Sequence, residues 1–177
     1  MSRKPNPWSS DYDWQTSVHG SYCGQSHPGS DSNIVYVKGT CKNNGREGAQ
    51  GGIGVHWRSE HGLNISDRYS GRQTNQSASL EAAIKAVEQA KVQNKDNIVV
   101  CTDSQLVTKG MNEWIDNWKG NDWKTSKNKD VVHREQFIKL DNLTQGMNVE
   151  WNYVPAYSKD GCNVAAQKLA RKATGKK

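Results

Sequence analysis

The order of its β and helical patterns is the feature that most restricts how this chain can fold. Residues 34–37, 51–57 and 63–69 are short β runs joined by turn-forming segments, which is typical of an antiparallel meander. A helix capped by Thr74, with alanines at helical spacing, then leads into a short apolar strand at residues 97–101. Because a helix leading into a buried strand indicates a parallel crossover, the pattern predicts a mixed sheet.

The rest of the chain completes an α/β arrangement. A helix is expected to start near Asp103, followed by a Trp- and Lys-rich segment, a helix at 133–143, a strand at 149–154 and a final helix at 162–172. The prediction is a five-stranded mixed sheet, three antiparallel strands and then parallel ones, flanked by helices. The corresponding domain covers residues 34–173.

Two segments fall outside the predicted domain. Residues 1–33 are rich in Ser, Gly, Asp, Asn and Pro without a helical or strand period, which predicts a disordered N-terminal arm. Its scattered aromatic residues are either incidental or short docking contacts for a protein partner. Residues 174–177 form a basic tail, which either attracts nucleic acid or simply keeps the end soluble.

The net charge of +6 narrows the classes of partner. The first 32 residues contain two basic and three acidic residues, so the positive excess lies in the folded part. Such an excess favours polyanions, nucleic acid above all, although a basic surface that only aids solubility is the alternative.

Hydropathy and cysteine spacing bear on location. No apolar run reaches the roughly 18 residues of a membrane span, and no apolar segment follows the basic residues at the N-terminus. We therefore expect an intracellular protein of the nucleus or cytoplasm, neither secreted nor bound to a membrane. The cysteines lack the paired spacing of a zinc site and are predicted to be reduced thiols: Cys23, Cys41, Cys101 and Cys162.

Several motifs, taken with the element order, carry a resemblance to a known family. They are residues 71–76 (Gly-Arg-Gln-Thr-Asn-Gln), 101–104 (Cys-Thr-Asp-Ser), 123–126 (Trp-Lys-Thr-Ser) and 143–147 (Leu-Thr-Gln-Gly-Met), together with Trp114, Trp118 and Lys119. From about Ile34 to Ala173 the chain resembles the catalytic domain of eukaryotic ribonuclease H1. The resemblance implies an enzyme that cuts the RNA strand of an RNA/DNA hybrid with two magnesium ions held by four carboxylates.

This chain departs from the family at the positions that hold metal. The four carboxylate positions are matched by Lys38, Ser79, Asp103 and Gln167, and the loop histidine that assists turnover is matched by Tyr157. We expect Lys38 to pair with Asp103 and magnesium binding to be lost, leaving no cofactor. Neither Glu81, on another face of the helix, nor Asp160, on a loop, would rebuild a two-metal site.

The positions that contact nucleic acid in the family are better preserved. For the RNA strand, amides that both donate and accept hydrogen bonds suit a 2′-hydroxyl, though taken alone these residues also read as a turn and a helix start. For the DNA strand, the resemblance implies a phosphate pocket, in which His133 replaces an asparagine, and an aromatic channel, in which Leu106 replaces a phenylalanine. Four lysines, listed below, resemble the basic protrusion of the family. For Trp118 and Trp123, packing within the helical core is the alternative to a binding role. The implied contacts are Cys41, Asn43, Asn44, Asn75 and Gln76 for RNA; Arg72, Thr74 and His133 for the pocket; Trp114, Trp118 and Ser126 for the channel; and Lys119, Lys124, Lys127 and Lys129 for the protrusion.

The function expected from these residues is a catalytically inactive protein resembling ribonuclease H1. It would bind RNA/DNA hybrid, or double-stranded RNA or DNA, without cleaving it. Two alternatives stay open: a protein-interaction scaffold built on the same fold, and an active hybrid ribonuclease with unusual metal ligands.

Overall fold

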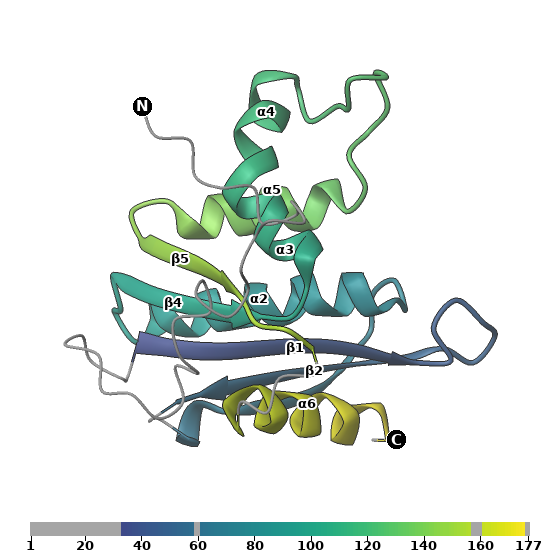
Figure 1. Ribbon diagram of the computed structural model, residues 1–177, viewed down its shortest axis with the longest axis vertical. Helices are drawn as coiled ribbons and strands as arrows, with labels where there is room; N and C mark the ends of the chain where they lie inside the picture. The colour runs from purple at the N-terminus through teal and green to yellow at the C-terminus, as the bar shows by residue number, and fades with distance from the viewer. Residues whose placement is uncertain (1–32, 59–60, 157–160, 176–177) are drawn as a thin grey trace, which may run out of the picture.

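A computed structural model describes residues 33–58, 61–156 and 161–175 of the chain (Figure 1). Residues 1–32 of the predicted N-terminal arm and the last two residues of the basic tail lie outside these ranges, as do Tyr157 and Asp160. In the described part, no helix is both long and apolar enough to cross a membrane.

The centre of the fold is a five-stranded mixed sheet, which confirms the predicted architecture. Its strands are β1 (Ile34–Lys42), β2 (Gln50–Trp57), β3 (Ile65–Tyr69), β4 (Asn97–Thr102) and β5 (Asn148–Tyr153), in the order β3-β2-β1-β4-β5. The first three strands pair antiparallel, whereas β4 pairs parallel with both β1 and β5.

Two strand boundaries differ from the sequence-based prediction by more than one residue. β1 continues five residues beyond Val37, because its backbone keeps pairing with β2 as far as Lys42 opposite Gln50. β3 begins at Ile65 because His61–Leu63 form a short 3-10 helix. Backbone pairing does not require apolar side chains, so hydrophobicity alone understated the length of β1.

Helices cover both faces of the sheet (Figure 1). α2 (Asn75–Val92) packs on β1 and β2, and its N-terminus is capped as predicted, with the Thr74 hydroxyl oxygen accepting from the Ser77 amide at 3.1 Å. α6 (Gly161–Thr174) lies on the opposite face against β1, β2 and β3, and is slightly longer than predicted at both ends.

Two glycines allow these helices to approach the sheet closely. A Cβ atom at Gly39 would lie 2.0 Å from the Ser79 nitrogen, and one at Gly54 would lie 2.2 Å from the Ala166 carbonyl oxygen. Any larger residue would push α2 or α6 away from the strands. The close approach brings the first turns of α2 and the middle of α6 to the same end of β1.

The remaining helices follow β4 and β5 in the chain. After β4 come α3 (Gln105–Lys109), capped by Ser104 rather than beginning at Asp103, a π-helical turn η3 (Gly110–Trp114) and α4 (Ile115–Gly120). α5 (Arg134–Thr144) then packs beside α2. Figure 1 shows α4 and the loop after it standing away from the sheet.

Side-chain alternation along β1 divides the core in two. Val35 and Val37 face the cluster under α2, whereas Ile34 and Tyr36 face the cluster that includes Ala166 of α6. Lys38 is the next residue on the α6 side in this alternation. The apolar pattern thus ends with a charged residue at the point where the candidate site begins.

The cysteines differ in part from the expectation of four reduced thiols. Cys41 and Cys101 are buried and not disulfide-bonded, as expected. Cys162 is disulfide-bonded, so the prediction is wrong for this residue. Spacing along the chain held no signal of such a bond.

Candidate nucleic-acid interface

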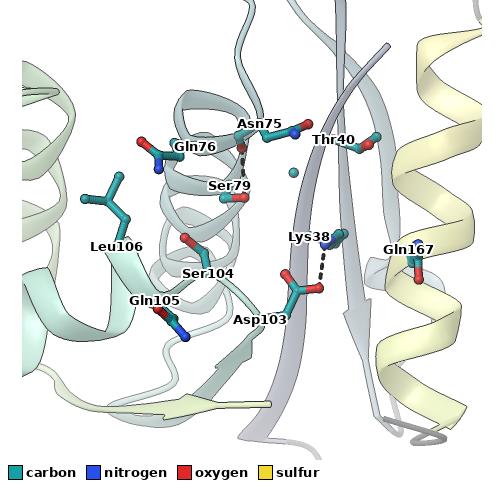
Figure 2. Close-up of a pocket in the computed structure, with 11 residues that line it drawn as sticks. Lys38, Thr40, Asn75, Gln76, Ser79, Asp103, Ser104, Gln105, Leu106 and Gln167 are labelled. Atoms are coloured by element: carbon teal, nitrogen blue, oxygen red, sulfur yellow. Dashed lines mark hydrogen bonds and ion pairs between the residues drawn. The ribbon is translucent and has the colours of Figure 1, made fainter. Parts of the chain in front are cut away.

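An ion pair between Lys38 and Asp103 occupies the centre of the candidate site, as expected from the sequence. The parallel register that pairs Val37 with Thr102 brings the next residue of each chain segment side by side. The Lys38 ammonium donates to the Asp103 Oδ2 atom (Figure 2). Only 18% of the Lys38 side chain and 4% of the Asp103 side chain are exposed, so the two charges neutralise one another in a largely desolvated setting.

The pair lies in a cavity of about 310 Å³ with a polar lining. Asp103 is the one acidic residue and Lys38 the one basic residue among those that line it. In Figure 2, Ser79 of α2 and Gln167 of α6 lie on either side of the pair. The other lining residues are Gly39, Thr40, Asn75, Gln76, Ser104, Gln105 and Leu106.

Ser79 does not take the place of a metal-binding side chain. Its hydroxyl donates to the carbonyl oxygen of Asn75, one turn earlier in α2, at 2.9 Å. This is the back-bonding geometry that serine commonly adopts within helices. The hydroxyl donor is therefore already used within its own helix.

The described residues do not fit a pair of magnesium ions. No three His, Cys, Asp or Glu side chains of the described ranges lie together as metal ligands. Magnesium needs near-octahedral oxygen coordination, and a two-metal site needs several anionic ligands to hold the ions together. A single carboxylate already paired with an ammonium does not meet that requirement.

The residues predicted to contact the RNA strand lie together at the start of α2. The Asn75 Oδ1 atom accepts from the Cys41 amide at 2.6 Å, and the Asn75 amide donates to the Asn44 Oδ1 atom at 3.2 Å. Asn43 has a positive φ of 56° in the turn after β1, and Gln76 lines the cavity. Burial raises the pKa of the Cys41 thiol, which keeps it neutral. The side chains of Asn44 and Asn75 thus already hydrogen-bond the end of β1 and the turn after it to the first residue of α2.

The three residues of the predicted phosphate pocket also converge. Burial, and secondarily the nearby Arg72 guanidinium, lower the pKa of His133, while a hydrogen bond with Gln136 acts in the opposite direction. Gln136 in turn bonds Ser77, whose amide is capped by Thr74. Arg72 is exposed, and His133 adopts a left-handed backbone conformation with a φ of 61° just before α5. Arg72 and His133 therefore lie near enough to interact, and Gln136 and Ser77 connect His133 to Thr74.

The predicted aromatic channel separates into an exposed ring and its support. Trp114 is 37% exposed, and its ring centroid lies 5.8 Å from that of Trp118. Trp118 packs against Phe137 with ring centroids 4.9 Å apart, and both Trp118 and Trp123 pack on the main core. The packing alternative considered from the sequence thus holds for Trp118 and Trp123, while Trp114 is partly exposed at the surface. Ser126 is exposed in the loop after α4.

The lysines of the predicted protrusion differ in their surroundings. Lys119 pairs with Asp141 at 3.3 Å, which offsets its charge. Lys124, Lys127 and Lys129 lie in residues 121–133, where Lys124 and Asp130 form an isolated antiparallel bridge. Within the described ranges none of these three lysines has an ion-pair partner within 4.0 Å. Their charges are available to a polyanion.

Two residues near the site were not singled out from the sequence. Gln136 connects His133 to Ser77, and the Lys109 ammonium lies 5.7 Å from the centroid of the Trp114 ring. The placement of Gln136 one turn after His133 was a usable signal once α5 was expected there. The Lys109 contact depends on the π-helical turn, which no sequence pattern indicated.

The mixed sheet and these motifs define an α/β domain, and comparison with known proteins specifies its family. The RNase H family model matches residues 30–175, so the chain belongs to the RNase H family. It is 48% identical to ribonuclease H1 of Mus musculus over 141 residues, which are 80% of this chain and 50% of that protein.

More distant relatives agree with this assignment. The chain is 37% identical over 140 residues to ribonuclease H of Francisella tularensis subsp. novicida, covering 79% of this chain and 89% of that protein. The crystal structure of RNase H1 from Halobacterium salinarum superposes with a TM-score of 0.56 at 26% identity, covering 79% of this chain and 95% of that one. The chain spans about half the length of the mammalian relatives it matches.

Proposed function

We propose that this chain binds RNA/DNA hybrid, or double-stranded RNA or DNA, and does not cleave it. The observation that carries the proposal is the Lys38–Asp103 ion pair. In an enzyme that holds two divalent cations at this place, an ammonium repels them, and the carboxylate that remains is already neutralised. Metal binding, and with it hydrolysis, is therefore lost in this proposal.

The binding half of the proposal is supported by the exposed groups outside the cavity. Arg72 and His133 suit a phosphate, and the face of Trp114 suits a deoxyribose, which lacks the 2′-hydroxyl that would disfavour an apolar contact. Asn44 and Asn75 hydrogen-bond to one another, and Asn75 and Gln76 line the cavity, so these amides would contact the second strand in this proposal. A surface that reads one strand by apolar packing and the other by amides favours a hybrid over either homoduplex.

Titrations of four ligands test the proposal. RNA/DNA hybrid, double-stranded RNA, double-stranded DNA and single strands are measured across salt, with and without magnesium or manganese, and cleavage is followed in the same samples. Phosphate contacts weaken for every ligand as salt rises. Contacts with 2′-hydroxyls instead make the affinity differ between ligands that carry these groups and ligands that lack them. We expect hybrid to bind most tightly and to remain intact.

Variants of the exposed residues provide the matched controls. Arg72→Ala and Trp114→Ala should each weaken hybrid binding, while Lys85→Ala, on the far part of α2, should not. Hybrid affinity that is the same in all four proteins would refute the binding surface. Metal-dependent loss of the RNA strand would instead identify an active ribonuclease with unusual ligands. A protein that ignores all four nucleic acids would favour a protein-interaction scaffold.

A further inference from the structure

The cavity around Lys38 has the composition of an anion site rather than of a cation site. Its lining contains one ammonium, one carboxylate, four side-chain amides and three hydroxyls. A site with four carboxylates repels phosphate unless metal ions intervene, but this one carries no net charge among its described lining residues. A phosphate would therefore enter without a metal.

Lys38 also has hydrogen-bonding capacity that its ion pair does not use. An ammonium carries three donors. Among the residues that the structure describes, Asp103 is the acceptor for one of them. Both residues line the cavity, but 18% of the Lys38 side chain is exposed against 4% of the Asp103 side chain. The basic member of the pair is therefore the more accessible one to an anion.

The neighbours of Lys38 place a nucleic-acid strand at the mouth of this cavity. Asn75 and Gln76 line it and also belong to the surface proposed above for the RNA strand. A strand that passes over these amides presents its backbone phosphates to the same hollow. A cavity of about 310 Å³ lies at the lower end of the range for small-ligand pockets, roughly 300–1,000 Å³, and so has room for such a group.

We infer that Lys38 is a phosphate anchor: its ammonium, held in place by Asp103, binds a backbone phosphate of the RNA strand and replaces the metal ions as the positive charge at this place. The inference rests on the proposed function, because it assigns a further contact to the same nucleic-acid surface. Lysine is a common phosphate ligand, acting as a point charge. Asp103 is then a positioning residue that also weakens the anchor, because it competes for the ammonium.

Two variants with opposite expected effects test this role. Lys38→Gln/Asp103→Asn removes both charges, leaves the net charge of the chain unchanged, and should weaken hybrid binding about tenfold and lower the salt slope by about one. Asp103→Asn alone frees the ammonium and should tighten hybrid binding. Asp67→Asn on the edge strand β3, exposed and outside the cavity lining, is the control for removing one negative charge elsewhere. Thermal unfolding of each variant establishes that it is folded.

Divalent ions provide a third arm of the experiment. At matched ionic strength, wild-type affinity for hybrid should be the same in magnesium and in a chelator. The inference is overturned if the double variant binds hybrid with wild-type affinity and salt slope, or if Asp103→Asn binds no more tightly than Asp67→Asn. It is equally overturned if magnesium tightens wild-type binding and Asp103→Asn abolishes that gain.

The same titrations separate this inference from the proposed function. If Arg72→Ala and Trp114→Ala weaken binding while the double variant does not, the nucleic-acid surface stands and only the Lys38 anchor fails. If the wild-type protein binds no nucleic acid, the proposed function fails and the anchor with it.

Discussion

The cavity around Lys38 and the surface around Trp114 belong to one domain but have diverged from the family by different amounts. In the cavity, the resemblance matches three of the four metal-holding positions to Lys38, Ser79 and Gln167. On the surface, it matches Arg72, Thr74, Trp114 and Trp118 to contacts of the same type, with exchanges at His133 in the pocket and Leu106 in the channel. In the proposed function, catalytic chemistry and strand recognition have therefore changed independently on this scaffold.

The reason lies in what each region contributes to folding. Carboxylates that hold metal repel one another when no metal is present, so replacing them costs the fold little and can relieve strain. Trp118, by contrast, packs on Phe137 and the main core, so the channel is partly made of residues that the fold needs. Packing alone is therefore a sufficient reason for a tryptophan at position 118.

The largest expected effect is recovery of catalysis by restoring the carboxylates. Lys38→Asp, Ser79→Glu and Gln167→Asp combined should produce magnesium-dependent cleavage of the RNA strand of a hybrid, at least about 1,000-fold above the wild-type rate, a small part of a typical enzymatic acceleration. Each single change should remain inactive, since two cations need several anionic ligands. Asp103→Asn in the restored background is the negative control. Cleavage of the hybrid by the wild-type protein would show that the cavity is catalytically active, and the proposed difference between cavity and surface would then be wrong.

Breaking the ion pair should destabilise the protein. Lys38→Met leaves the Asp103 carboxylate, 4% exposed, without its partner, and should lower the free energy of unfolding by about 3 kcal/mol. Replacing both residues, as Lys38→Met/Asp103→Leu, should cost much less because no buried charge is left alone. Chemical denaturation of the three proteins measures the difference. Equal losses in the single and double variants would show that the pair matters only through side-chain packing.

On the surface, binding and stability should separate between two tryptophans. Trp114→Ala should weaken hybrid binding about fivefold, corresponding to roughly 1 kcal/mol of lost ring packing, with little change in stability because the ring is exposed. Trp118→Ala should lower the unfolding free energy by about 2 kcal/mol or more, because its ring packs on Phe137. Hybrid titration and denaturation of both variants give the comparison. A large stability loss for Trp114→Ala would assign it to the core instead.

The smallest effect should be the pH dependence that His133 introduces. Burial and Arg72 lower its pKa in the folded state, so the unfolded state takes up the proton first as pH falls. Stability associated with His133 is therefore fully present above its unfolded pKa of about 6.5 and is lost as pH falls through the folded value. A bound phosphate favours the imidazolium, so hybrid affinity should rise over the same window.

His133→Asn tests this behaviour by difference. Asparagine accepts the left-handed backbone found at residue 133 and does not titrate, so the variant should fold well. Both pH dependences should be smaller in His133→Asn than in the wild type, measured by denaturation and hybrid titration from pH 5 to 8. Identical profiles in the two proteins would place phosphate away from His133.

The amino-acid sequence by itself determined the mixed sheet, the Thr74 cap and the replacement of three metal-binding carboxylates. The turn and helix patterns along the chain predict the order of the strands. Residue identity decides the metal ligands, because a lysine ammonium has no acceptor atom to coordinate magnesium. The pairing of Lys38 with Asp103 was also foreseen, because both match positions that converge in the family.

Only the tertiary structure decided how side chains of known identity are oriented and covered. Ser79 turns back onto the Asn75 carbonyl, Trp114 lies outside while Trp118 lies beneath it, and Lys119 is neutralised by Asp141 on another helix. Each of these depends on contacts between segments far apart in the chain, such as the close approach of α2 to β1 at Gly39. Sequence periodicity reports which face a residue occupies, whereas its partner and exposure arise only when the elements pack together.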